Sequence, residues 1–208
     1  MKNFVLILAV FLFFSSYTGV TQTVQTLKTE ESYNDKAALL KYYEETAKEL
    51  ENKIKGLSEV QLKFKPSEES WSISQCLEHI IATEKMLFGM TKELLEKPEN
   101  AERRSEITVT DEQLVSGMTD RSTKYKASAE IQPEGTYTSP QEALKDFKEQ
   151  REEIQSFIKN SKANMRNYIS DSPAGAVDGH QSLLFIAGHT ARHTKQIEEI
   201  ISQPAFPN

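Results

Sequence analysis

The sequence has a single cysteine, Cys76, among its 208 residues. One thiol cannot form a disulfide within the chain, so a small disulfide-stapled fold is excluded. The chain also has no excess of basic residues, because 25 lysines and arginines face 31 aspartates and glutamates, a formal net charge of −6. A nucleic-acid-binding domain needs a basic surface, so this balance argues against nucleic acid as a partner.

Long apolar runs are missing as well, since a membrane-spanning helix needs about 20 apolar residues. The longest run, residues 4–14, has eleven residues, follows Lys2 and precedes small and polar residues. This arrangement is typical of a secretory signal peptide. We expect residues 1–22 to be a signal peptide and residues 23–32 a polar tether. The domain is then exported, periplasmic or secreted, with no membrane attachment after cleavage; an uncleaved anchor is the alternative.

Four segments repeat apolar residues every three or four positions, as the buried faces of amphipathic helices do. They cover about residues 33–55, 72–97, 139–159 and 178–202. Ser72 and Asp178 are expected N-caps, each followed three residues later by a glutamine. Ser139 is also an expected N-cap, followed by a proline at the first helical position and a glutamate at the third. Residues 111–118 are expected to form a short helix, and residues 57–71, 131–139 and 160–177 to form loops. No segment is predicted to form a β-sheet. The sequence therefore predicts an all-α four-helix bundle with long connections over residues 33–208.

Histidine is scarce, with four residues in the chain, and three of them lie inside predicted helices. His189 and His193 are one helical turn apart, so both imidazoles project from the same face, together with Ile186 and Ile197. His79 lies in the helix predicted for residues 72–97. Inward-facing imidazoles are costly unless they are hydrogen-bonded or bound to metal. We therefore predict a metal site made by His79, His189 and His193, with hydrogen-bonded core histidines as the alternative.

Neutral imidazole suits zinc, nickel, copper and iron, so the ligand type alone does not select the metal. A three-histidine metal with one open position lowers the pKa of a bound water toward ~7, or that of a bound thiol. The chain has no H-E-x-x-H motif, so a zincin-type protease is not indicated. Cys76, three residues before His79, is expected to fill the core rather than act as a fourth ligand. Glu84 and Gln196 are candidates to orient a ligand imidazole, or are simply polar residues at the core edge.

Two motifs carry a resemblance to a known family: W-S-I-x-x-C-L-E-H-I, which ends at Ile80, and F-I-A-G-H-T-x-R-H-T-x-Q-I, which ends at Ile197. Together they resemble the DinB-like, YfiT-type superfamily of metal-binding four-helix bundles, over about residues 33–202. The resemblance implies that His79 from the second long helix and His189 and His193 from the fourth are the ligands, often of zinc or nickel. It places no ligand at His180.

Members of this superfamily are linked to hydrolase, isomerase and thiol-dependent transferase chemistry, which leaves the activity open. The first hypothesis is an exported metal-dependent hydrolase or transferase that acts on a small molecule. Export makes the thiol transferase less fitting, because its low-molecular-weight thiol is cytosolic. A non-catalytic metal- or ligand-binding bundle and a bundle with a purely structural metal are the alternatives. The sequence names no substrate and no oligomeric state, and a homodimer stays open.

Overall fold

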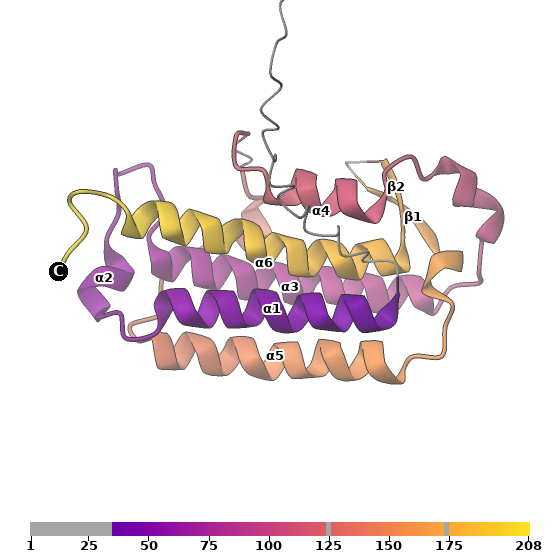
Figure 1. Cartoon of the computed structure of the whole chain (residues 1–208), viewed down its shortest axis with the longest axis horizontal. Coiled ribbons are helices and arrows are strands. Elements are labelled where there is room, and N and C mark those ends of the chain that lie inside the picture. Colours follow the sequence, from indigo (N-terminus) through magenta and orange to yellow (C-terminus); the bar gives the residue numbers. More distant parts are fainter. Residues whose placement is uncertain (1–34, 124–125, 173–174) are drawn as a thin grey trace, which may run out of the picture. The chain divides into compact units, whose positions relative to one another are not determined.

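The computed structural model describes residues 35–123, 126–172 and 175–208. The predicted signal peptide, residues 1–22, and tether, residues 23–32, lie outside the described residues. Four long helices lie side by side as a bundle (Figure 1): α1 (Lys36–Ile54), α3 (Ile73–Leu95), α5 (Pro140–Asn160) and α6 (Gly179–Ile201). The predicted four-helix bundle is confirmed. Among the described helices, none combines the length and the hydropathy needed to cross a bilayer.

The order of the helices around the bundle brings α3 and α6 together. α6 packs against both α1 and α3, and α5 packs against the same two helices from the opposite side. A shorter helix, α4 (Asp111–Thr119), lies along the outside of α6 and confirms the helix predicted for residues 111–118. Side chains on the facing sides of α3 and α6 can therefore converge inside the bundle.

The helices begin and end at the residues whose side chains favour those ends. The side chains of Ser72 and Asp178 each accept the backbone N–H three residues ahead, and the glutamine there bonds back to the cap, which makes two capping boxes. The Ser139 side chain accepts the backbone N–H of Glu142 and so caps α5, with a proline at the first helical position. Gly56 follows α1 with a φ of 82°, a left-handed conformation that glycine adopts without strain. The predicted caps are confirmed.

The connections hold more regular structure than the sequence predicted. Strands β1 (Ile169–Ser172) and β2 (Gly175–Asp178) form an antiparallel pair in which Ile169 faces Asp178. The prediction of no sheet, with residues 160–177 as a loop, was therefore wrong. Each strand has four residues, too few to show the alternation of apolar and polar side chains that marks a strand in a sequence. The strand β1 also depends on a distant residue, because the Asn100 side chain bonds both the N–H and the carbonyl of Ile169. The remaining short elements are α2 (Glu59–Lys63), η1 (Ala101–Glu106), η2 (Ala129–Ile131) and η3 (Met165–Asn167).

Buried apolar side chains form two clusters that follow one another along the helices. One includes Leu39, Tyr43, Phe88, Ile154 and Leu184, and the other includes Leu50, Leu77, Phe147, Ile197 and Ile200. Buried polar side chains lie between the two clusters in sequence position on each long helix: Thr46, Glu84, Arg151, His189, Thr190 and His193. His79 lies on α3 beside Ile80, the last α3 residue of the second cluster. The bundle thus has a polar layer at its middle, and the three predicted ligands belong to it.

Candidate metal centre

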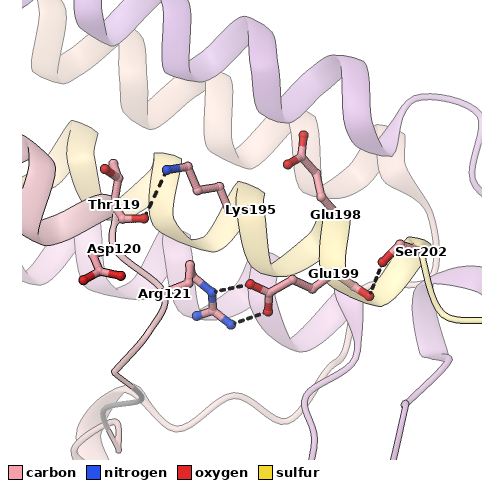
Figure 2. Close-up of a pocket in the computed structure, with 7 residues that line it drawn as sticks. All are labelled: Thr119, Asp120, Arg121, Lys195, Glu198, Glu199 and Ser202. Atoms are coloured by element: carbon pink, nitrogen blue, oxygen red, sulfur yellow. Dashed lines mark hydrogen bonds and ion pairs between the residues drawn. The ribbon is translucent and has the colours of Figure 1, made fainter.

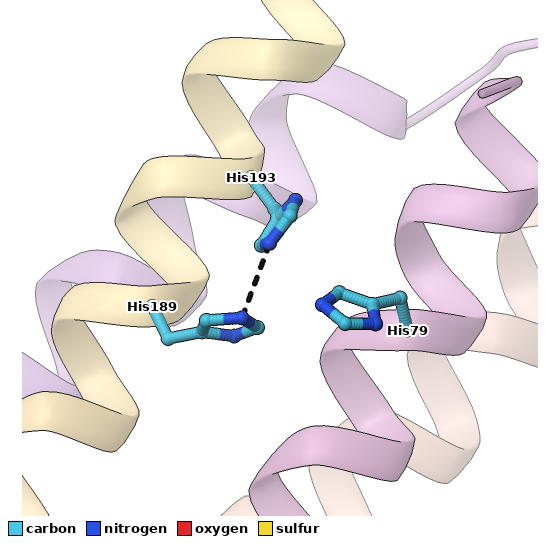
Figure 3. A group of neighbouring side chains, drawn as sticks. All are labelled: His79, His189 and His193. Carbon is cyan, nitrogen blue, oxygen red and sulfur yellow. Dashed lines mark hydrogen bonds between the residues drawn. The ribbon is translucent and has the colours of Figure 1, made fainter. Parts of the chain in front are cut away.

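The three predicted ligands come together between α3 and α6 (Figure 3). One ligating atom from each of His79, His189 and His193 lies within 4.8 Å of the others. The ring centroids are 4.4–5.0 Å apart in all three pairs. His189 and His193 face the same way because they are one turn apart on α6, and α3 brings His79 opposite them. The structure thus assembles the set that the sequence predicted.

Two of the imidazoles have a hydrogen-bond partner on the side away from this cluster. Nδ1 of His79 lies 3.0 Å from the carbonyl oxygen of Ile131, and Nδ1 of His193 lies 2.9 Å from Oε1 of Gln196. A carbonyl oxygen only accepts, so each Nδ1 donates and each Nε2 keeps its lone pair. A partner of this kind fixes the tautomer and orientation of a metal-ligating histidine. Of the two residues predicted as candidates to orient a ligand imidazole, Gln196 contacts one of the histidines.

The third imidazole is held differently. Nε2 of His189 lies 3.1 Å from Nε2 of His193, and Nδ1 of His189 is buried with no hydrogen-bond partner among the described residues. Two ring nitrogens that face each other at this distance need a proton or a cation between them. This set of nitrogen donors fits a divalent metal of the zinc or nickel type.

Burial keeps the imidazoles neutral. It lowers the pKa of His79 and places the pKa of His189 well below its usual value. The pKa of His193 falls to about 3, chiefly through burial and secondly through the neighbouring charge of His79 when that ring is protonated. Neutral imidazole is the form that coordinates metal. The electrostatics of the site therefore favour a ligand set over a set of buried cations.

Aromatic rings wall the cluster. The centroid of Trp71 lies 4.8 Å from that of His79 and 6.0 Å from that of His193, and Phe185 stacks on His189 at 6.4 Å. No role at the site was predicted from the sequence for Trp71 or Phe185. Their place in the two histidine motifs is the only sequence signal for it. These rings put low-dielectric material around the imidazoles, which strengthens electrostatic interactions there.

Three other candidates lie apart from the cluster. Cys76 is fully buried in the second apolar cluster, and burial raises the pKa of its thiol to about 12, as expected of a core residue. Glu84 pairs with Arg151 at 2.6 Å instead of orienting an imidazole. His180, at the start of α6, lies 3.8 Å from the carboxylate of Asp111.

The segment that carries the Ile131 carbonyl is tied to α3 by hydrogen bonds. The carboxylate of Glu78 accepts from the backbone N–H of Gly135 at 2.5 Å and from the hydroxyl of Thr136 at 2.7 Å. Burial raises the pKa of Glu78, but these bonds outweigh it and the net pKa is lowered. Gly135 has a φ of 82°, and a Cβ there would lie 2.8 Å from Cγ of Gln75, so only glycine fits. The sequence predicted an irregular segment here but not its role beside His79.

An open groove of about 630 Å³ runs along the outer side of α6 (Figure 2). It is lined by Thr119, Asp120, Arg121, Lys195, Glu198, Glu199 and Ser202. Arg121 lies between the groove and the histidines: it bonds Glu199 with Nε and Nη2, at 3.1 and 2.8 Å, and Oε1 of Gln196 with Nη1 at 3.3 Å. The groove is thereby linked to His193 through two side chains.

A helical bundle with three buried imidazoles converging from two neighbouring helices has the architecture of a metal-binding bundle protein. The model of the DinB superfamily matches residues 30–197, and the chain belongs to this superfamily. It is 28% identical over 159 residues to the uncharacterized protein YuaE of Bacillus subtilis (strain 168), a match that covers 76% of this chain and 94% of YuaE.

Among solved structures, the chain resembles YfiT from Bacillus subtilis, described as a probable metal-dependent hydrolase with an unusual four-helix bundle topology. The TM-score is 0.56 at 14% sequence identity, over 84% of this chain and 90% of YfiT. At this identity the likeness concerns the fold. It agrees with the four-helix bundle predicted from the sequence.

Proposed function

We propose that this protein is an exported metal-dependent enzyme, a hydrolase that acts on a small molecule. His79, His189 and His193 hold its zinc or nickel ion and leave one coordination position open. The observation that carries the proposal is the convergence of three buried, neutral imidazoles, two of them with their Nδ1 atoms bonded to oxygen acceptors. The description of YfiT as a probable metal-dependent hydrolase supports it. Thiol transfer is the second candidate, and export makes it the weaker one.

Each residue around the proposed metal has a separate role. His79 and His193 present Nε2 inward because Ile131 and Gln196 hold their Nδ1 protons. Trp71 packs against the rings of His79 and His193. When bound, a divalent metal with an open position supplies Lewis acidity and lowers the pKa of a water or thiol that binds to it.

No general base is assigned to the two carboxylates nearest in sequence on α3. Glu78 accepts hydrogen bonds from Gly135 and Thr136, and Glu84 pairs with Arg151. Both carboxylates are thereby committed to holding the protein together. Either carboxylate would have to break one of these contacts to accept a proton from a substrate or a water. The proposed chemistry does not need such a step.

The experiment is turnover by protein purified without an affinity tag, stripped of metal and reloaded with zinc or nickel. A panel of activated esters, amides and thiol conjugates serves as substrate. We expect metal-dependent hydrolysis by the parent and by His180→Ala, the matched control on the same helix, and none by His193→Ala. Equal turnover by His193→Ala would contradict the proposal. A protein that holds one ion per chain and turns over nothing in the panel would favour the non-catalytic binding bundle.

A further inference from the structure

Arg121, Gln196 and His193 form a chain of hydrogen bonds from the groove to the histidine cluster. A single atom, Oε1 of Gln196, lies 2.9 Å from Nδ1 of His193 and 3.3 Å from Nη1 of Arg121. The guanidinium is also bonded to Glu199 through two nitrogens (Figure 2), and its side chain is only 16% exposed. Arg121 is therefore held in one orientation while it faces Gln196.

The chemistry of these groups fixes the direction of every bond in the chain. A guanidinium carries donors and no acceptor, so Arg121 requires the oxygen and not the nitrogen of the Gln196 amide to face it. The same oxygen faces His193, so Nδ1 must carry the proton and Nε2 must carry the lone pair. Without Arg121, the amide is free to turn and offer its NH₂ group to Nδ1. The proton would then move to Nε2, the atom that a ligand needs unprotonated.

The backbone around Arg121 is anchored to the helix that carries two of the histidines. The guanidinium of Arg192, on α6, donates to the carbonyls of Met118 at 3.2 Å, of Thr123 at 2.5 Å and of Asp120. Arg192 is itself buried, with 6% of its surface exposed. The segment after α4 thus has a fixed position relative to His193, as a residue that orients a ligand requires.

We propose that Arg121 is a positioning residue that sets the tautomer of His193 through Gln196. The inference rests on the proposed function only where it treats His193 as a metal ligand, because the tautomer itself can be measured without metal. His79 is an internal reference: its Nδ1 is held by the backbone carbonyl of Ile131, which no substitution at Arg121 removes.

The test is a long-range ¹H–¹⁵N correlation spectrum of the metal-free protein with ¹⁵N-labelled histidine, which reports for each ring which nitrogen is protonated. Arg121→Met is compared with the parent, with Gln196→Glu and with Arg103→Met. Arg103 is the matched control because it makes a similar surface ion pair, with Glu106 and Asp171, and has no bond to the site. Circular dichroism checks that each variant is folded.

We expect the Nδ1–H tautomer of His193 in the parent, in Arg103→Met and in Gln196→Glu, since a carboxylate also only accepts. Arg121→Met should populate Nε2–H at His193 while His79 stays Nδ1–H, and should weaken zinc binding about ten-fold or more. An unchanged His193 tautomer in Arg121→Met would overturn the inference, and so would an equal change at His79. A parent that binds no zinc would refute the proposed function, while the tautomer comparison would still decide the role of Arg121.

Discussion

The Nε2 atoms of His189 and His193 lie 3.1 Å apart across one turn of α6. Because Gln196 fixes the proton of His193 on Nδ1, the Nε2 atom of His193 accepts in this contact and that of His189 donates. The Nδ1 atom of His189 is then unprotonated and carries a lone pair. This agrees with its lack of a hydrogen-bond partner among the described residues. A metal ion in place of the shared proton would satisfy both facing nitrogens.

The buried ion pair beside the site makes a prediction about stability. Nη2 of Arg151 lies 2.6 Å from the carboxylate of Glu84, with 3% and 0% of the two side chains exposed. Arg151→Met leaves a buried charge unpaired, so we expect the free energy of unfolding to fall by about 3–5 kcal/mol. Urea denaturation measures it.

The matched control is Lys148→Met, which removes an exposed ion pair between Lys148 and Glu51 on the same helix as Arg151. Exposed pairs contribute less than about 1 kcal/mol, so this variant should unfold close to the parent. The double variant Glu84→Leu with Arg151→Met should be more stable than Arg151→Met alone, since no charge stays buried. A similar fall in the free energy of unfolding for Arg151→Met and Lys148→Met would mean that the buried pair stabilises the fold no more than the exposed pair does.

The sequence predicted the long helices and the shared face of His189 and His193 because both depend on local spacing. The apolar period and the caps at Ser72, Ser139 and Asp178 define helices within one chain segment. The four-residue interval places His189 and His193 on one face whatever surrounds them. Only the convergence of His79 required the packing of α3 on α6. It was predicted because His79 lies inside a second long helix of the bundle, and the family resemblance implied the same three residues.

What the sequence did not predict depends on contacts between distant segments. A backbone carbonyl such as that of Ile131 has no residue type to mark it, although it lies 52 positions from His79. Arg121 lies 75 positions from Gln196 and follows a helix that packs outside the bundle. Glu84 looked equally able to orient an imidazole, because its partner Arg151 is on another helix and 67 positions away. Such pairs become visible only once the helices are packed.

Removal of metal should leave the fold intact. The two apolar clusters hold all four long helices without a contribution from the histidines, so the helical circular dichroism signal of the chelated protein should match that of the loaded one. Loss of the helical signal after chelation would favour the alternative of a purely structural metal.

Cys76 should give no thiolate-to-metal absorption band. Its thiol is buried among apolar side chains, with the pKa raised to about 12, so cobalt-loaded parent and Cys76→Ser should have matching visible spectra. A small added anion should perturb both spectra through the open position. A thiolate-to-cobalt band that disappears in Cys76→Ser would make Cys76 a ligand and close the site.

The metal-free protein should lose stability as the pH falls below the reference histidine pKa of ~6.5. Burial lowers the pKa of His193 to about 3 and that of His189 well below its usual value, so below ~6.5 the unfolded chain binds protons that the native state does not. The urea midpoint should therefore decline toward acid more steeply in the parent than in a variant with both histidines replaced by phenylalanine. Parallel pH profiles for the two proteins would contradict the assigned pKa shifts.

The most direct test of the three-histidine site is the metal content of untagged protein, measured by elemental analysis on the parent and on four alanine variants. We predict one zinc or nickel ion per chain in the parent and in His180→Ala, because His180 lies beside Asp111, away from the cluster. Tight binding should be lost in His79→Ala, His189→Ala and His193→Ala, since each removes one of the converging nitrogens. Full metal content in His193→Ala would contradict the three-histidine site.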